Sequence, residues 1–134
     1  MKSFETVLAF VDQVWNAHNP AAADEFVDDD IVVVIGGNEL RGKEKLKGWI
    51  AEFLDKVNEL TIDPIETFQN QDGNRVTSRW LMEGTNNGLL GTERDGQPIG
   101  LTGIAVWELD SNGKLRRGWI EQSSMEQYSR LLAR

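Results

Sequence analysis

The apolar residues change their spacing near residue 57, and this change limits the folds open to the chain. Before it, over 4–15 and 44–57, they recur every three or four residues, which is the period of an amphipathic helix. After it, short alternating segments are separated by turn signals: Asp72-Gly73, Asn87-Gly88 and Asn112-Gly113. Helices gathered ahead of a run of hairpins predict an α+β domain in which one curved sheet wraps around the N-terminal helices.

The pattern also predicts where each element lies. Helices are expected over 4–15, 20–27, 44–57 and from 124 onward, and strands over 31–35, 60–68, 75–85, 99–109 and 114–122. Ser3 is the expected N-cap of the first helix, and Ser124 with Gln127 is the expected capping box of the last. Pro64 has no N–H to donate, so its strand is expected at a sheet edge or with a bulge.

Composition excludes several classes of function. The 134 residues include no cysteine and a single histidine, His18, so thiol nucleophiles, Cys-ligated metals and most His-containing catalytic sets are disfavoured. The net charge of −8 disfavours nucleic acid and anionic membrane surfaces as partners. No apolar run is longer than Ile31–Ile35, which is far too short for a membrane span, and the N-terminus does not read as a signal peptide. We expect one cytoplasmic domain, 1–134, without metal or cofactor.

Two short motifs have a functional and a structural interpretation. Gly37–Lys43 has the spacing of a phosphate-binding loop, but Glu44 stands where a Ser or Thr would hold magnesium, so a turn before a helix is favoured. Asp28-Asp29-Asp30 could attract a cation, but consecutive carboxylates point in different directions, so a solvated loop is favoured. His18, near a helix end, is expected to serve structure.

Charged residues share strands with tryptophans in the C-terminal half. Alternation places Arg79 and Glu83 on one face of the strand over 75–85, opposite Val76, Ser78, Trp80 and Met82. It likewise aligns Trp119 and Glu121 on the strand over 114–122, together with Leu115, Arg117 and Ser123. A carboxylate beside an indole is desolvated, which raises its pKa and suits it to general acid catalysis. The alternative is a set of cross-strand ion pairs on a solvent-facing or dimer face.

Several fragments, taken in order, resemble the SnoaL-like branch of the nuclear-transport-factor-2-like superfamily. They are Val14–Asn19, Asp28–Asp30, Leu40–Glu44, Val76–Trp80 with Glu83–Thr85, and Asn112–Leu115 followed by Trp119 and Tyr128–Leu131. The resemblance covers nearly the whole chain. It implies a cystatin-like cone, a mixed but mostly antiparallel sheet curved around helices, with a pocket inside and a homodimer formed through the outer face of the sheet. The family includes cofactor-free polyketide cyclases, enzymes that open epoxides or isomerise lipophilic compounds, and members that only bind.

The family's catalytic residues do not carry over to this chain. The acid/base Asp of the resembling cyclases falls on Ile120 and their His falls on Ala105, and neither side chain transfers a proton. Asn86 stands where the family has the His of a Gly-Thr-His phrase, and Ser123 stands where it has a second Asp. Only a bulge that moves Glu121 into the acid's place would restore a proton carrier.

The resemblance and the missing catalytic residues leave two main functions, an enzyme and a binding protein, which differ in whether the pocket changes its ligand. In the first, which the resemblance favours slightly, the protein is a cyclase, isomerase or hydrolase with Glu121 as general acid/base, and Arg79 or Asn86 holds a carbonyl or enolate oxygen. In the second, the pocket binds a small apolar or aromatic ligand without changing it. The expected ligand-binding residues are Trp15, Trp49, Phe53, Asn86 and Trp119. A protein–protein adaptor that uses the outer face is a third alternative.

Overall fold

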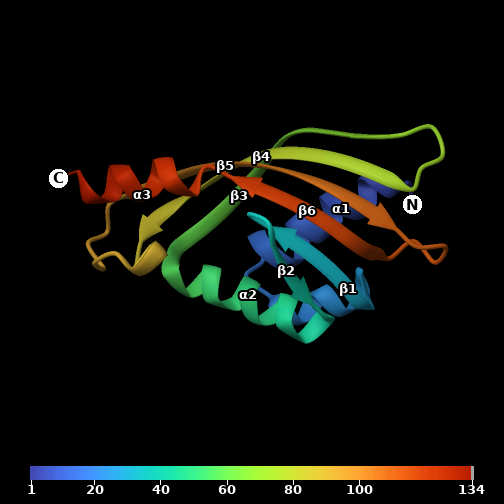
Figure 1. Cartoon of the computed structure of the whole chain (residues 1–134), viewed down its shortest axis with the longest axis horizontal. Helices are drawn as coiled ribbons and strands as arrows, with labels where there is room; N and C mark the ends of the chain where they lie inside the picture. The colour runs from blue at the N-terminus through green and yellow to red at the C-terminus, as the bar shows by residue number, and fades with distance from the viewer. Residues whose placement is uncertain (134) are drawn as a thin grey trace.

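A computed structural model of the chain confirms the α+β class and the curved sheet (Figure 1). The structure describes residues 1–133, and Arg134, the last residue of the expected domain, lies outside them. The helices are α1 (Ser3–Phe10), the π-helix η1 (Val11–Asn16), the 3-10 helices η2 (Pro20–Glu25) and η3 (Leu89–Gly91), α2 (Lys43–Lys56) and α3 (Ser124–Leu132). The strands are β1 (Val27–Ile35), β2 (Asn38–Arg41), β3 (Val57–Gln69), β4 (Arg75–Asn86), β5 (Pro98–Leu109) and β6 (Leu115–Gln122).

The six strands form one sheet in the order β2-β1-β6-β5-β4-β3. The pairing of β1 with β6 is parallel and the other pairings are antiparallel, so the sheet is mixed and mostly antiparallel, as the resemblance implies. Side chains of α1, η1 and α2 join one face of this sheet in a single buried core, and we call that face the inner face. Figure 1 shows α3 extending past one end of the sheet, with the two chain termini at opposite ends of the long axis.

The strand β2 is absent from the sequence-based prediction. Gly36 and Gly37, both with positive φ, turn the chain back after β1, and residues 38–41 then pair with residues 32–35. The polar composition of this short strand hides it from a search for alternating apolar residues. Because residues 38–41 are extended along β1, the segment Gly37–Lys43 does not form a loop around a phosphate.

The first helix ends in a π-helix that attaches it to β3. The side chain of Asn16 makes two hydrogen bonds with the backbone of Ile62: Nδ2 donates to the carbonyl at 3.0 Å, and Oδ1 accepts from the N–H at 2.7 Å. His18 Nε2 lies 2.7 Å from the carbonyl oxygen of Leu60. These contacts lie beside the irregularity in the β3–β4 register between Asn58 and Thr61. His18 is therefore a structural residue here.

Both predicted caps are wrong. The hydroxyl of Ser3, the first residue of α1, donates to the carbonyl of Gly73 in the β3–β4 turn. Gln127 does not cap α3, because its Oε1 accepts the N–H of Gly100 at 2.8 Å and so ties α3 to β5. The expectation for Pro64 is confirmed: β3 is an edge strand and its register with β4 shifts after this residue.

Candidate functional site

The registers of β4, β5 and β6 align inner-face side chains in rows across the sheet. Written from β4 to β6, three successive rows are Val76-Trp107-Gly118, Ser78-Ala105-Ile120 and Trp80-Gly103-Gln122. The first and third rows each combine one tryptophan with one glycine. The row between them carries only small or aliphatic side chains, and it contains both positions, Ala105 and Ile120, onto which the resemblance lays the family's catalytic pair.

Each of these tryptophans covers the glycine on the next strand. A β-carbon built on Gly103 would lie 2.6 Å from Cε2 and 2.9 Å from Nε1 of Trp80. One built on Gly118 would lie 2.6 Å from Cε3 of Trp107. Contacts this short leave no room for a side chain, so glycine is what lets each indole approach the backbone of the neighbouring strand. The two indoles thus flank the row of Ser78, Ala105 and Ile120.

A hollow lies between these rows and the helices. Its lining combines aromatic, aliphatic and neutral polar side chains: Val7, Phe10, Val11, Trp15, Trp49, Ile62, Ser78, Trp80, Met82, Trp107, Ile120 and Gln122. None of these lining side chains, all drawn from residues 1–133, is a carboxylate, an amine, a guanidinium or an imidazole. The hollow is narrow, with a cavity volume of about 40 Å³. A cavity of about 150 Å³ holds benzene, so a ring-sized ligand needs at least one wall side chain to move.

Besides the indoles of Trp15, Trp49 and Trp107, three lining side chains carry polar atoms. The hydroxyl of Ser78 shares a hydrogen bond of 2.9 Å with the hydroxyl of Thr67. The Nε1–H of Trp80 is buried and has no hydrogen-bond partner within the described part of the chain. Such a buried, unpaired donor costs about 1–3 kcal/mol. Gln122, which is aligned with Trp80 across Gly103, lines the same hollow.

Two of the predicted aromatic residues line this hollow, and a third packs behind them. Trp15 and Trp49 contact each other edge to face, with ring centroids 5.6 Å apart. Phe53 contacts both, with centroids 6.1 Å from Trp15 and 5.4 Å from Trp49. Trp119 lies elsewhere, on the outer face, where the guanidinium of Arg75 is 5.4 Å from its ring centroid. The aromatic cluster of η1 and α2 therefore forms the helical wall of the hollow.

Glu121 and Arg79 lie on the outer face, away from the hollow. The β5–β6 register is continuous from Gly103–Gln122 to Glu108–Arg117, so no bulge turns Glu121 inward. Ile120 is buried and faces the hollow instead. Glu121 and Arg79 do share a groove on the outer face, where Arg79 Nε donates to Glu66 at 2.7 Å. A catalytic role for this pair inside the hollow thus has no geometric support.

The alternation predicted for 114–122 holds except at its start. Leu115 is buried on the inner face although Arg117, Trp119 and Glu121 are not. The register between β5 and β6 shifts after Glu108, and this irregularity turns Leu115 to the side opposite to the one expected.

Asn86 is buried and its hydrogen bonds are made within the protein. Its Oδ1 accepts the backbone N–H groups of Gly88 and Leu89 at 3.1 and 2.8 Å. Its Nδ2 lies within 3.1 Å of three acceptors, which belong to Thr92, Glu93 and Asp95. Asn86 therefore organises the loop between β4 and β5. Its side-chain oxygen and nitrogen are already used in these hydrogen bonds, so the expected hydrogen bond from Asn86 to a ligand has no free atom to form it.

The sequence-based site missed most of the sheet side of the hollow. Alternation does place Ser78 and Trp80 on one face with the buried Met82, so it contained a signal for these two residues. The covering of Gly103 by Trp80 and of Gly118 by Trp107 depends on register across three strands. Register is set by pairing and turn geometry, which single-strand patterns do not reveal.

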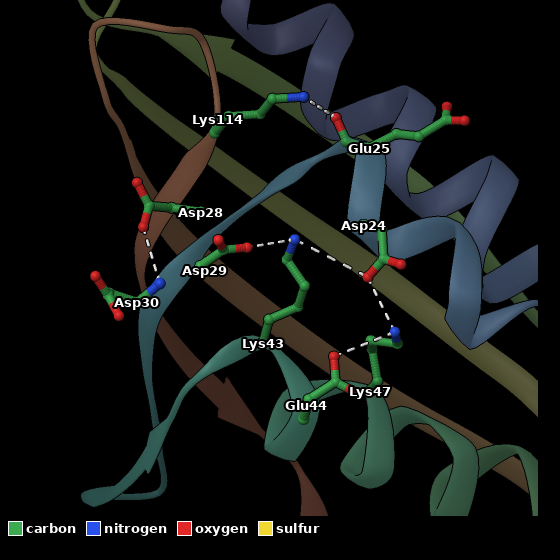
Figure 2. Close-up of polar contacts among 9 residues, drawn as sticks. All are labelled: Asp24, Glu25, Asp28, Asp29, Asp30, Lys43, Glu44, Lys47 and Lys114. Carbon is green, nitrogen blue, oxygen red and sulfur yellow. Dashed lines mark hydrogen bonds and ion pairs between the residues drawn. The ribbon is translucent and has the colours of Figure 1, made fainter.

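Carboxylates of η2 and β1 form ion pairs with lysines at the start of α2 (Figure 2). Lys43 Nζ lies 2.6 Å from Asp29 Oδ1 and 4.0 Å from Asp24 Oδ1, and Lys47 Nζ lies 2.9 Å from Asp24 Oδ1. The hydrogen bond from Lys47 lowers the pKa of Asp24, and the hydrogen bond to Asp29 raises the pKa of Lys43. Lys43, the residue that a phosphate loop would direct at its ligand, is thus neutralised by the protein's own carboxylates.

The three consecutive aspartates do not converge on a common point. Asp29 binds Lys43, whereas Asp28 Oδ1 accepts the N–H of Asp30 at 2.9 Å (Figure 2). Within residues 1–133, no three His, Asp or Glu side chains are grouped so that they could hold a metal ion. Over the same residues, no helix combines the length and the apolar character that crossing a membrane requires.

Residues 7–118 match the family model described as the SnoaL-like domain. No curated protein matches the sequence. Among solved structures, a candidate SnoaL-like polyketide cyclase from Jannaschia sp. CCS1 is 17% identical, with a TM-score of 0.88 over 98% of this chain and 92% of that one. IdmH, a candidate polyketide cyclase from Streptomyces antibioticus, is 16% identical, with a TM-score of 0.85 over 99% of this chain and 100% of that one.

A third similar structure contains a ligand. It is a hypothetical protein with a ketosteroid isomerase-like fold from Catenulispora acidiphila DSM 44928, in complex with trimethylamine. It is 18% identical, with a TM-score of 0.71 over 87% of this chain and 83% of that one. At these identities the three likenesses establish a shared fold.

Proposed function

Because the chain belongs to the SnoaL-like domain family, we propose that it binds a small, uncharged and largely apolar molecule in the hollow between its helices and the inner face of its sheet. The observation that carries this proposal is the lining of that hollow, which is rich in indole and aliphatic groups and contains no ionisable side chain among residues 1–133. Burial of apolar ligand surface supplies about 25 cal/mol per Å². A charged ligand would lose its hydration and gain no ion pair in return.

The same lining disfavours proton-transfer catalysis in the hollow. Ala105 and Ile120 hold the positions of the family's catalytic pair, and Glu121 faces the other side of the sheet. The hydrogen-bonding side chains that remain are Ser78, Gln122 and the lining tryptophans, which form hydrogen bonds without changing charge near neutral pH. The ligand is therefore bound and released unchanged.

The narrowness of the hollow implies that binding displaces a wall, and Trp49 is the side chain best placed to move. It lines the hollow and also a surface groove of about 250 Å³ between α2 and η3. It is only partly buried, unlike Val7 and Phe10 on the opposite helix. Movement of this one indole would join the two spaces and give a ring-sized ligand a route from solvent.

We also propose that the protein is a homodimer that pairs through the outer face of its sheet. Phe68 and Ile104 lie on that face with 55% and 44% of their surface exposed. Both flank the strand that carries Arg79, which is itself paired with Glu66. Exposed apolar side chains gathered on one sheet face are typical of a surface that another subunit covers.

Binding is tested by titrating the protein with cyclohexanone and following its melting temperature and its tryptophan fluorescence. A neutral ligand of the native state raises the melting temperature as its concentration exceeds Kd, and it is recovered unchanged. Ile120→Phe, which fills the hollow, is expected to abolish the effect, whereas Glu121→Gln on the outer face is the matched control that leaves it unchanged. A chemically altered compound, or loss of binding in Glu121→Gln, would contradict the proposal.

A further inference from the structure

We propose that the indole N–H of Trp80 is the group that orients the ligand, so that the ligand carries a hydrogen-bond acceptor such as a carbonyl or ether oxygen. This inference rests on the proposed function and specifies the chemical class of the ligand. It starts from Trp80 Nε1, which is buried and has no hydrogen-bond partner within residues 1–133. Native proteins pair nearly all such atoms, so an unpaired donor on the wall of a hollow needs an explanation.

The position of this donor is set by the sheet. Trp80 pairs with Gly103, and Gly103 pairs with Gln122, so the three residues form one row from β4 to β6. Because Gly103 has no side chain, the indole covers it, and Nε1 would lie 2.9 Å from a β-carbon built there. The nitrogen thus lies over Gly103, the middle residue of the row. Gly103 acts here as a positioning residue for the indole.

The neighbouring polar groups narrow the class of ligand. Tryptophan only donates, so a ligand must supply an acceptor to use this N–H. Ser78 already shares its hydroxyl with Thr67, whereas no hydrogen bond of the Gln122 side chain is found within the described residues. The Gln122 side chain, whose amide can donate and accept, is therefore a second group that a ligand in the hollow can use. A neutral acceptor satisfies this pair without bringing an unpaired charge into an apolar hollow.

Two probes of the same shape separate hydrogen bonding from apolar burial. Cyclohexanone and methylenecyclohexane differ only in that a carbonyl oxygen replaces a CH₂ group. Both are titrated into the wild-type protein, Trp80→Phe and the control Gly100→Ala, whose β-carbon would contact nothing within 4 Å. Loss of one neutral hydrogen bond weakens binding about three- to tenfold. We expect that loss for cyclohexanone in Trp80→Phe, and a smaller change for methylenecyclohexane.

A second measurement needs no variant, which covers the case in which Trp80→Phe does not fold. The indole N–H signal of Trp80, assigned by triple-resonance NMR in the wild-type protein, is expected to move downfield with cyclohexanone and to stay nearly constant with methylenecyclohexane. If both probes bind and neither moves this signal selectively, Trp80 is only a packing residue and this inference is overturned. If neither probe binds the wild-type protein, the proposed function itself fails, and this inference fails with it.

Discussion

The indole of Trp80 occupies the space above Gly103 that a β-carbon would need, with its Cε2 only 2.6 Å from that position. The two residues are paired neighbours on β4 and β5, so this contact is fixed by the register of the sheet. The width of the hollow therefore depends on residue 103 having no β-carbon. A side chain on the glycine would push the indole toward the opposite wall.

Gly103→Ala is therefore expected to destabilise the fold by about 1–3 kcal/mol, the usual cost of overpacking a well-filled region. Urea denaturation measures this loss. Gly100→Ala on the same strand is the matched control, since a β-carbon there meets nothing within 4 Å, and it should change stability far less. Equal stabilities of the two variants would contradict the contact.

Asn86→Ala is expected to lower the free energy of unfolding by about 2–3 kcal/mol, because two buried N–H groups, of Gly88 and Leu89, lose their acceptor. Asn87→Ala is the control: its side chain makes one solvent-exposed hydrogen bond, to the carbonyl of Asp55, so its loss should stay below about 1 kcal/mol. Chemical denaturation of both variants tests this difference. Comparable losses would show that the buried amide is not what holds the loop.

Acid should remove a contribution made by Asp110. Burial alone would raise the pKa of this carboxyl, but the hydrogen bond from the Lys114 N–H, the contact with Asp28, the Asn112 N–H and the charge of Arg116 together lower it. A carboxyl whose pKa is lower in the folded than in the unfolded state stabilises the fold at pH values above its unfolded-state pKa. That stabilisation is lost as the pH falls below the ordinary pKa of 3.8 and then through the lower pKa of the folded protein.

Asp110→Asn tests this contribution, because an asparagine oxygen can still accept from the N–H groups of Asn112 and Lys114 but gains no proton in acid. The wild-type protein is expected to lose more stability than the variant as the pH falls below about 4. Denaturation curves measured across that range give the comparison. If the two stabilities fall in parallel, the lowered pKa of Asp110 makes no contribution to the fold.

Ile104→Glu is expected to convert the proposed dimer to monomer, because it places a charge at an apolar position on the outer face. Light scattering after size exclusion should then give about 15.1 kDa in place of about twice that mass. Gln13→Glu, an exposed change on the helical side, is the control and should leave the mass unchanged. A monomeric wild-type protein would contradict this assembly.

Residue periodicity predicted the elements well where apolar side chains mark a face, and it failed where the information lies in pairing. The helix around Ile50 and the strand around Met82 follow directly from spacing. The strand Asn38–Arg41 has no apolar alternation, so only its pairing with β1 reveals it. Ser3 and Gln127 were expected to cap helices, but their hydrogen bonds cross to distant segments that local patterns cannot identify.

The candidate site divides in the same way. Trp15 and Trp49 were expected to line it because they lie on the apolar stripes of helices. The placement of Glu121 depended on a bulge, and the continuous register of β5 and β6 decides it. The unpaired N–H of Trp80 depends on what every surrounding residue does with its own polar atoms, and no spacing rule contains that information.

The location of bound cyclohexanone tests the central claim most directly, and it can be read from intermolecular nuclear Overhauser effects in isotopically labelled protein. The uncharged hollow predicts contacts from the ligand to the indoles of Trp15 and Trp107 and to the methyl groups of Ile120, with the ligand recovered unchanged. Contacts confined to Ile104 and Phe68 on the outer face, or conversion of the ligand to another compound, would contradict it.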